Sequence, residues 1–208
     1  MHSPSTSPAA ATAPAATGAQ AHHHAHGPAN RRRRVVDPAA PLFVRFAPSV
    51  AATAVVVLHD VRGLTDEAER VVRQLAGRGH LALAPIFYHD IGGRVLSGPH
   101  EAAVDTLATK SLSRLRDDIA GALDYTGRRC GIPARDTAVL GIGSGGYLAA
   151  LAAAEYSLAA AAGVTPWQAM PQEGALALGE LVSRTTTPWR SVDQDAEAVS
   201  FVAASLRA

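Results

Sequence analysis

From residue 42 onward, short apolar runs alternate with longer segments in which apolar positions recur every three or four residues. Continuous runs such as AVVVL at 54–58 are typical of strands buried on both faces of a parallel sheet, and the longer segments predict amphipathic helices. This order predicts an α/β fold with three layers and a mainly parallel sheet, with a glycine-rich loop between 88 and 111. The expected strands are 42–46, 54–58, 80–87, 137–140, 158–164 and 187–192, and the expected helices are 65–78, 112–128, 174–183 and 195–206.

The first forty residues differ in composition from the rest of the 208-residue chain. Ala, Pro, Ser and Thr dominate, with histidines at 22, 23, 24 and 26 and arginines at 31–34. We expect 1–40 to be a disordered tail, because so few apolar side chains cannot offset the entropy of ordering it. Metal binding by the histidines, and an export signal or a polyanion contact at the arginines, are alternatives. Residues 41–208 then form one α/β domain.

Charge and cysteine content narrow the classes of function. The net charge is +1 and the basic residues beyond the tail are scattered, so we expect a small-molecule partner and neither nucleic acid nor a membrane surface. The single cysteine, Cys130, excludes an intramolecular disulfide and fits a reducing cytoplasm. No uninterrupted apolar run reaches about 18 residues, so no membrane span is expected. Nothing in the domain calls for a cofactor or a metal ion.

The segment TAVLGIGSGGYLAALAAA at 137–154 predicts a strand, a sharp turn and a helix. Two chemistries use this geometry. It can present a nucleophile on a strained turn, and Gly141, Gly143 and Gly146 also satisfy the G-x-G-x-x-G pattern of dinucleotide-binding domains. That second pattern expects an acidic residue about 20 positions later, and the sequence at 163–166 is GVTP.

Four segments together resemble the dienelactone hydrolase family of α/β-hydrolases. They are VVVLHDVRGL at 55–64, ALAPIFYHD at 82–90, the GIGSGG turn and TTPWRSVDQDAEAV at 186–199. The resemblance implies a carboxylic ester or lactone hydrolase whose cysteine or serine nucleophile stands third in the glycine-rich turn. Gly143 holds that position here, so no covalent intermediate can form on it. Ser144 follows, and we expect its hydroxyl to point away from the nucleophile's place and to cap the helix.

The other catalytic residues of the family are also altered. Its acid matches Asp195, but no histidine follows His100, and the chain ends where the family adds a strand, a histidine loop and a helix. His59 is a candidate displaced base, and the alternative is a histidine held by local hydrogen bonds. The resemblance places substrate residues at Asp60, Tyr88 and Asp90, and it places oxyanion donors at the amides of Val61 and Ser144.

Three hypotheses follow. The first is an ester or lactone hydrolase with impaired catalysis, and the second is a pseudo-enzyme of the same fold that binds a small molecule or a partner chain. The third is a dinucleotide-binding domain using the three glycines of the turn. Without a further strand, 187–192 would lie at a sheet edge, where pairing with another copy would form a homo-oligomer.

Overall fold

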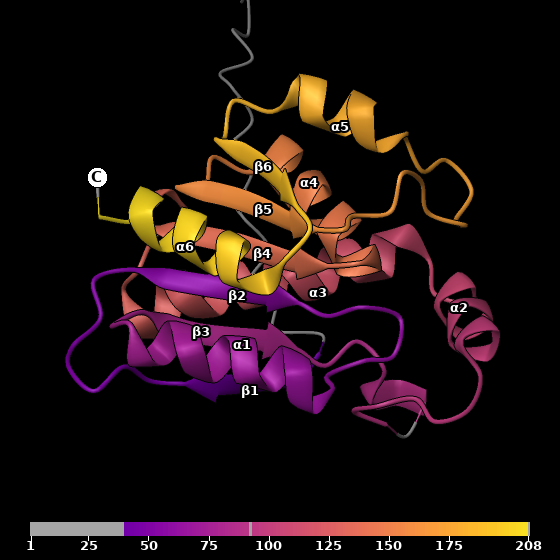
Figure 1. Ribbon diagram of the computed structural model, residues 1–208, viewed down its shortest axis with the longest axis horizontal. Helices are drawn as coiled ribbons and strands as arrows, with labels where there is room; N and C mark the ends of the chain where they lie inside the picture. Colours follow the sequence, from indigo (N-terminus) through magenta and orange to yellow (C-terminus); the bar gives the residue numbers. More distant parts are fainter. Residues whose placement is uncertain (1–39, 92, 208) are drawn as a thin grey trace, which may run out of the picture. The chain divides into compact units, whose positions relative to one another are not determined.

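The computed structural model describes residues 40–91 and 93–207. The expectations for the tail lie outside these residues, apart from position 40. In the described part, six strands form one sheet in the order β1-β3-β2-β4-β5-β6 (Figure 1). β1 runs antiparallel to β3 and all other neighbours are parallel, which confirms the expected mainly parallel sheet. The strands are β1 Leu42–Arg45, β2 Ala54–Leu58, β3 Leu81–Pro85, β4 Thr137–Ile142, β5 Ala160–Val164 and β6 Trp189–Val192.

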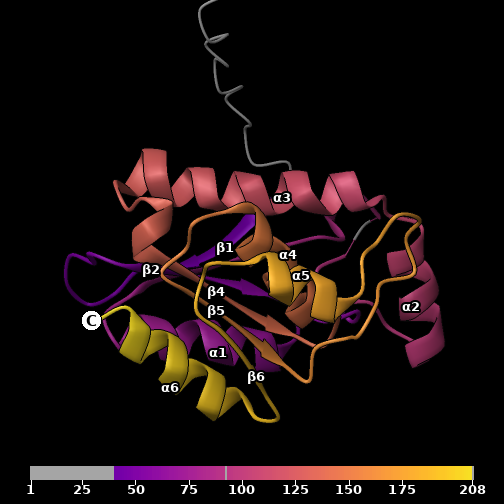
Figure 2. The same ribbon diagram turned by 90° about the horizontal axis from the view of Figure 1, so that it is seen from above.

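Helices cover both faces of the sheet, as Figure 2 shows. α1 and α6 lie on one face, and α3, α4 and α5 lie on the other. The helices are α1 Asp66–Gly77, α2 His100–Ala108, α3 Leu112–Asp124, α4 Ser144–Glu155, α5 Leu178–Arg184 and α6 Asp195–Ser205. The short helices are η1 His89–Ile91, η2 Tyr125–Arg129 and η3 Ala134–Asp136.

The uniform apolar character of β2 follows from these three layers. Val55 and Val57 pack into the core shared with α1 and α6, whereas Val56 and Leu58 pack into the core shared with α3 and α4. Successive side chains of a strand point to opposite faces, so both sets must be apolar when both faces are covered. The expected strand at 54–58 is confirmed at both ends.

Helix α1 shows how local sequence sets an element boundary. The hydroxyl of Thr65 accepts a hydrogen bond from the amide of Ala68 at 3.4 Å, which satisfies one of the free donors of the first turn. Acidic side chains in that turn interact favourably with the helix dipole. The helix ends before Gly79, as expected, and Gly79 adopts a positive φ of 98°.

One expectation about the connection between β3 and β4 needs correction. The loop expected at 88–111 contains α2, which begins at His100 directly after Pro99. Only Ala103 and Leu107 of α2 are buried, so the helix shows little of the periodicity that predicts one. The helix expected at 112–128 is α3, which continues from Tyr125 as a π-helical turn. No helix in the described ranges is long and apolar enough to cross a membrane.

Candidate active site at the carboxyl ends of the strands

The turn between β4 and α4 places Gly143 at the carboxyl edge of the sheet. Gly143 has φ 56° and ψ −116°, a strained conformation that side chains rarely adopt. Its amide donates to the carbonyl of Val164 at 2.9 Å, and its carbonyl accepts from Gly146 and Trp167 at 3.0 and 3.1 Å. These bonds hold the chain in a sharp turn from strand to helix, the geometry that presents a nucleophile in α/β-hydrolases.

The carboxylate of Asp60, which follows β2, occupies the space in front of Gly143. A β-carbon on Gly143 would lie 2.3 Å from Asp60 Oδ1. That same oxygen accepts hydrogen bonds from the amide of Ser144 at 2.9 Å and from its hydroxyl at 3.1 Å. The Asp60 carboxylate therefore occupies the position of a nucleophile's β-carbon. It also accepts a hydrogen bond from the Ser144 amide, which is the amide expected to stabilise an oxyanion.

Ser144 departs from its expected arrangement. It is buried at 2% exposure, and its hydroxyl binds Asp60 rather than capping the first turn of α4. The hydroxyl is thus turned toward the space beside Gly143, not away from it. A serine nucleophile needs a neighbouring base to take its proton, and Asp60 is the group that Ser144 contacts.

The remaining glycines of the turn serve close packing of the backbone. A β-carbon on Gly145 would lie 2.1 Å from the carbonyl oxygen of Leu58, and one on Gly141 would lie 1.9 Å from the carbonyl oxygen of Gly145. Glycine is required where strand and helix approach this closely. The glycines at 141 and 145 are therefore explained by backbone packing, without a bound phosphate.

Both ring nitrogens of His59 are hydrogen-bonded to the backbone. Nε2 accepts from the amide of Phe87 at 3.3 Å, so Nδ1 carries the hydrogen and donates to the carbonyl of Asp60 at 2.9 Å. The ring packs edge-on against Phe87, with centroids 4.7 Å apart. Burial lowers the pKa of His59 to about 4, although the Asp60 carbonyl bond raises it. The geometry matches the alternative of a histidine held by local hydrogen bonds.

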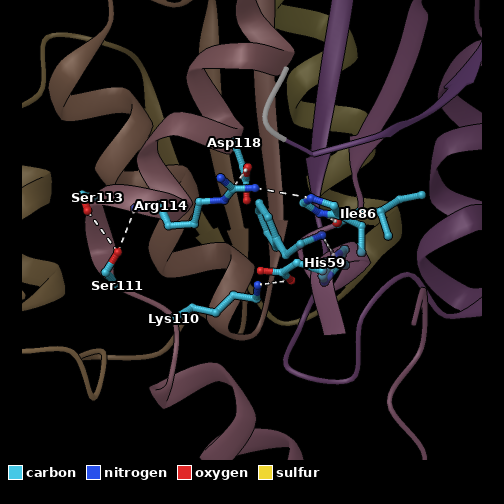
Figure 3. A network of polar contacts seen from close by, with 10 residues as sticks. His59, Ile86, Lys110, Ser111, Ser113, Arg114 and Asp118 are labelled. Atoms are coloured by element: carbon cyan, nitrogen blue, oxygen red, sulfur yellow. Dashed lines mark hydrogen bonds and ion pairs between the residues drawn. The ribbon is translucent and has the colours of Figure 1, made fainter. Parts of the chain in front are cut away.

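The negative charge of Asp90 is paired with a lysine. Its carboxylate accepts a bond of 2.5 Å from Lys110, whose side chain is only 5% exposed, and this bond lowers the pKa of Asp90 (Figure 3). Lys110 thus neutralises a carboxylate that the resemblance places among the substrate residues. Sequence reasoning missed Lys110, which lies twenty positions away between α2 and α3. Tyr88 is buried nearby, and burial, followed by the charge of Asp60, raises its pKa.

A second group of charged side chains joins η1 to α3. The guanidinium of Arg114 contacts Nε2 of His89 at 3.3 Å and Oδ1 of Asp118 at 3.5 Å (Figure 3). The Asp118 side chain has no exposure to solvent. Burial raises the pKa of Asp118 to about 6, against the opposing charge of Arg114. The partly exposed guanidinium of Arg114 thus forms an ion pair with the buried carboxyl group of Asp118 beside the site.

Among the described residues, no hydrogen bond or ion pair joins Ser144 to Asp195 or Val61, the other expected residues. Asp195 begins α6, and its pKa is raised by burial and then by Glu67 of α1. Val61 is fully buried directly after Asp60. The described hydrogen bonds of Ser144 reach Asp60 and no histidine. Among the described residues, no group of histidine, cysteine and carboxylate side chains could hold a metal ion.

This fold and this turn define a member of the α/β-hydrolase class. A profile of the dienelactone hydrolase family matches residues 42–181, and the chain belongs to that family. A search of curated proteins found no match.

Solved structures of related proteins share the fold. A protein described as a dienelactone hydrolase from Klebsiella pneumoniae is 17% identical with a TM-score of 0.64, covering 81% of this chain and 76% of that one. A dienelactone hydrolase-like promiscuous phosphotriesterase from metagenomic libraries is 19% identical with a TM-score of 0.51, covering 78% and 76%. The Bacillus cereus carboxylesterase is 11% identical with a TM-score of 0.51, covering 80% and 95%. At these identities the likeness concerns the fold.

Proposed function

We propose that this chain is a dienelactone hydrolase family member with impaired catalysis, which binds a small ester- or lactone-like molecule without ordinary turnover. The observation that carries the proposal is the carboxylate of Asp60 at 2.3 Å from the position of a Gly143 β-carbon. Covalent ester hydrolysis needs a nucleophile at this position and donors aimed at the developing oxyanion. Here the nucleophile's place is held by glycine, and the Ser144 amide is already bonded to Asp60.

The electrostatics of the turn support the same proposal. A tetrahedral intermediate would carry its negative charge close to the Ser144 amide, where the Asp60 carboxylate already lies. Two negative groups competing for one donor raise the energy of the intermediate instead of lowering it. The candidate base, His59, is not free to take a proton from a nucleophile, because its ring nitrogens are bonded to the backbone of Asp60 and Phe87.

The dinucleotide alternative is disfavoured by the same carboxylate. A pyrophosphate at the start of α4 would have to displace Asp60 from Ser144 and lie beside its charge. We also propose a cytoplasmic location, which rests on the single cysteine.

The test is hydrolysis of p-nitrophenyl acetate and of a dienelactone by the full chain. We expect rates that stay near the buffer background and are unchanged in Ser144→Ala, which keeps the amide and removes the hydroxyl. Ser183→Ala removes a hydroxyl from an exposed position of α5 and serves as the matched control. Ordinary enzymatic rates that disappear in Ser144→Ala but persist in Ser183→Ala would show that Ser144 is the nucleophile and would overturn the proposal.

A further inference from the structure

Three arginine side chains gather around one phenylalanine ring at the β1 edge of the sheet. The guanidinium carbons of Arg45, Arg94 and Arg73 lie 4.5, 5.4 and 5.9 Å from the centroid of the Phe43 ring. Phe43 and Arg45 belong to β1, Arg73 belongs to α1, and Arg94 follows η1. Segments distant in sequence thus bring three positive charges to one place, which we call the arginine cluster.

One carboxylate fixes two members of the arginine cluster. Glu69 of α1 has a side chain that is 11% exposed, and it bonds Arg73 through one oxygen and Arg94 through the other. Both arginine side chains remain about half exposed, at 51% and 52%. A guanidinium carries five N–H donors, so each arginine keeps donors that Glu69 does not use.

The backbone of Arg94 is also held in place. Its carbonyl accepts from the amide of Leu64 at 2.7 Å, and a β-carbon on Gly63 would lie 2.3 Å from that carbonyl oxygen. The close approach requires glycine at position 63, which has a φ of 89°. Arg94 is therefore preorganised on two sides, and a ligand would not have to order it on binding.

Arg45 leaves the arginine cluster with an excess of positive charge. In the described part of the chain it forms no ion pair; its guanidinium lies over the Phe43 ring and donates one hydrogen bond, to the Val44 carbonyl at 3.5 Å. Three guanidiniums against the single carboxylate of Glu69 leave two positive charges around one ring. Three guanidiniums that lie 4.5–5.9 Å from the centroid of one ring repel one another electrostatically, and a bound anion would relieve that repulsion.

We propose that the arginine cluster binds the phosphate group of a small phosphorylated molecule. A phosphate monoester carries about −1.5 to −2 charge near neutral pH, which matches the excess of two positive charges. Its oxygens also accept the paired N–H bonds that guanidinium groups offer. This site is built from β1, α1 and the loop after η1, and it does not depend on the function proposed for the turn at Gly143.

The experiment is calorimetric titration of the full chain with inorganic phosphate and with phenyl phosphate, at constant ionic strength in sodium chloride. We expect saturable binding of both ligands, weakened at least about tenfold in Arg45→Gln, because the substitution removes charge-assisted hydrogen bonds. Arg45→Gln breaks no ion pair within the described residues, so we expect it to fold normally. Arg45→Lys keeps the charge and should bind with intermediate affinity.

The matched control is Arg135→Gln, which removes an arginine with a 78% exposed side chain from η3. It should bind both phosphates like the wild type. The arginines at 31–34 are present in every variant, so their contribution cancels in these comparisons. Three results would each overturn the proposal. The wild type could show no saturable phosphate binding, or Arg45→Gln and Arg135→Gln could lose equal affinity. The chain could also bind an oligonucleotide while binding neither phosphate.

Discussion

Asp60 and Ser144, 84 positions apart in the sequence, meet at the catalytic turn, where one carboxylate oxygen accepts from both the amide and the hydroxyl of the serine at 2.9 and 3.1 Å. This relationship decides how the site should be interpreted. The turn keeps its strained backbone geometry, and the space that such a turn provides for a nucleophile is filled by an internal acid.

The first prediction concerns the contact between Asp60 and a side chain at position 143. Gly143→Ala should lower the free energy of unfolding by about 2–4 kcal/mol, because alanine is strained at positive φ and displaces Asp60 from Ser144. In the Asp60→Ala background the same substitution should cost about 1–2 kcal/mol less, since the clash is gone. Urea denaturation of the four proteins measures the difference.

Gly179→Ala is the control for this cycle, because Gly179 lies in α5 with open space around its β-carbon position. It should stabilise the protein by about 0.5–1 kcal/mol, as alanine does in a helix. Strictly additive costs of Asp60→Ala and Gly143→Ala would contradict the placement of Asp60 in front of Gly143.

The second prediction concerns Asp118, whose pKa is raised to about 6 by burial. Between about pH 4 and 6 the folded state holds a proton that the unfolded state has released. This contribution to stability is therefore full below about pH 4 and is lost as the pH rises through 6. Asp118→Asn should raise the free energy of unfolding at pH 8 by on the order of 1–3 kcal/mol and should change it little at pH 4. Urea denaturation at the two pH values checks this. Equal effects at both would exclude a raised pKa of Asp118.

The third prediction concerns His59, whose pKa is lowered to about 4 by burial. Here the unfolded state binds a proton that the folded state excludes, so stability is present above about pH 6.5 and is lost as the pH falls toward 4. The loss should reach on the order of 3 kcal/mol. Because Asp118 acts in the opposite direction over the same range, the loss should be measured in the Asp118→Asn background.

In that background, His59→Gln should reduce the loss of stability between pH 6.5 and 4 to the contribution of His80, whose pKa is also lowered by burial. His100→Gln, at an exposed position of α2, should retain the full loss. Thermal unfolding followed by circular dichroism measures both variants. If the loss persisted unchanged in His59→Gln, another group would be responsible.

The fourth prediction concerns the open edge of β6. β6 pairs with β5 on one side, and the amides of Ala161 and Thr165 donate to the carbonyls of Pro188 and Val192. Along a strand, the backbone N–H and C=O groups of successive residues point alternately to the two sides. The amide of Ser191 therefore points away from β5, to the side where no described strand pairs with β6. We propose that two copies pair through this edge. Light scattering after size-exclusion chromatography should show a dimer for the wild type and a monomer for Ser191→Pro, which removes an outward amide. A wild-type monomer across the accessible concentrations would contradict this.

The strands and most helices could be predicted because the positions of their apolar side chains in the sequence match the positions that are buried. The AVVVL run of β2 is apolar on both faces because helices cover both. Helix α2 could not be recognised, because most of its residues face solvent; only Ala103 and Leu107 are buried, and Val104 packs partly against the core. Its apolar period is too sparse to distinguish it from a loop.

The candidate site could be predicted only in part. The position of Gly143 in the turn followed from the pattern of glycines, and the structure confirms a strained turn there. The bonds from Asp60 to Ser144 and from Lys110 to Asp90 join segments far apart in the chain, and no local periodicity reports them. The expectation that Ser144 turns away assumed regular helix geometry and omitted the attraction of its hydroxyl to a carboxylate.

The central claim is that Asp60 blocks the turn at Gly143 and leaves Ser144 unactivated. The most direct test is covalent labelling with a fluorophosphonate, which phosphonylates an activated serine with loss of fluoride. Intact-mass spectrometry followed by peptide mapping would report any adduct on Ser144. We predict no adduct on the wild-type chain, because the Ser144 hydroxyl is bonded to Asp60 and the described residues provide no histidine to activate it. A stoichiometric adduct on Ser144 would contradict the account and identify the chain as a serine hydrolase.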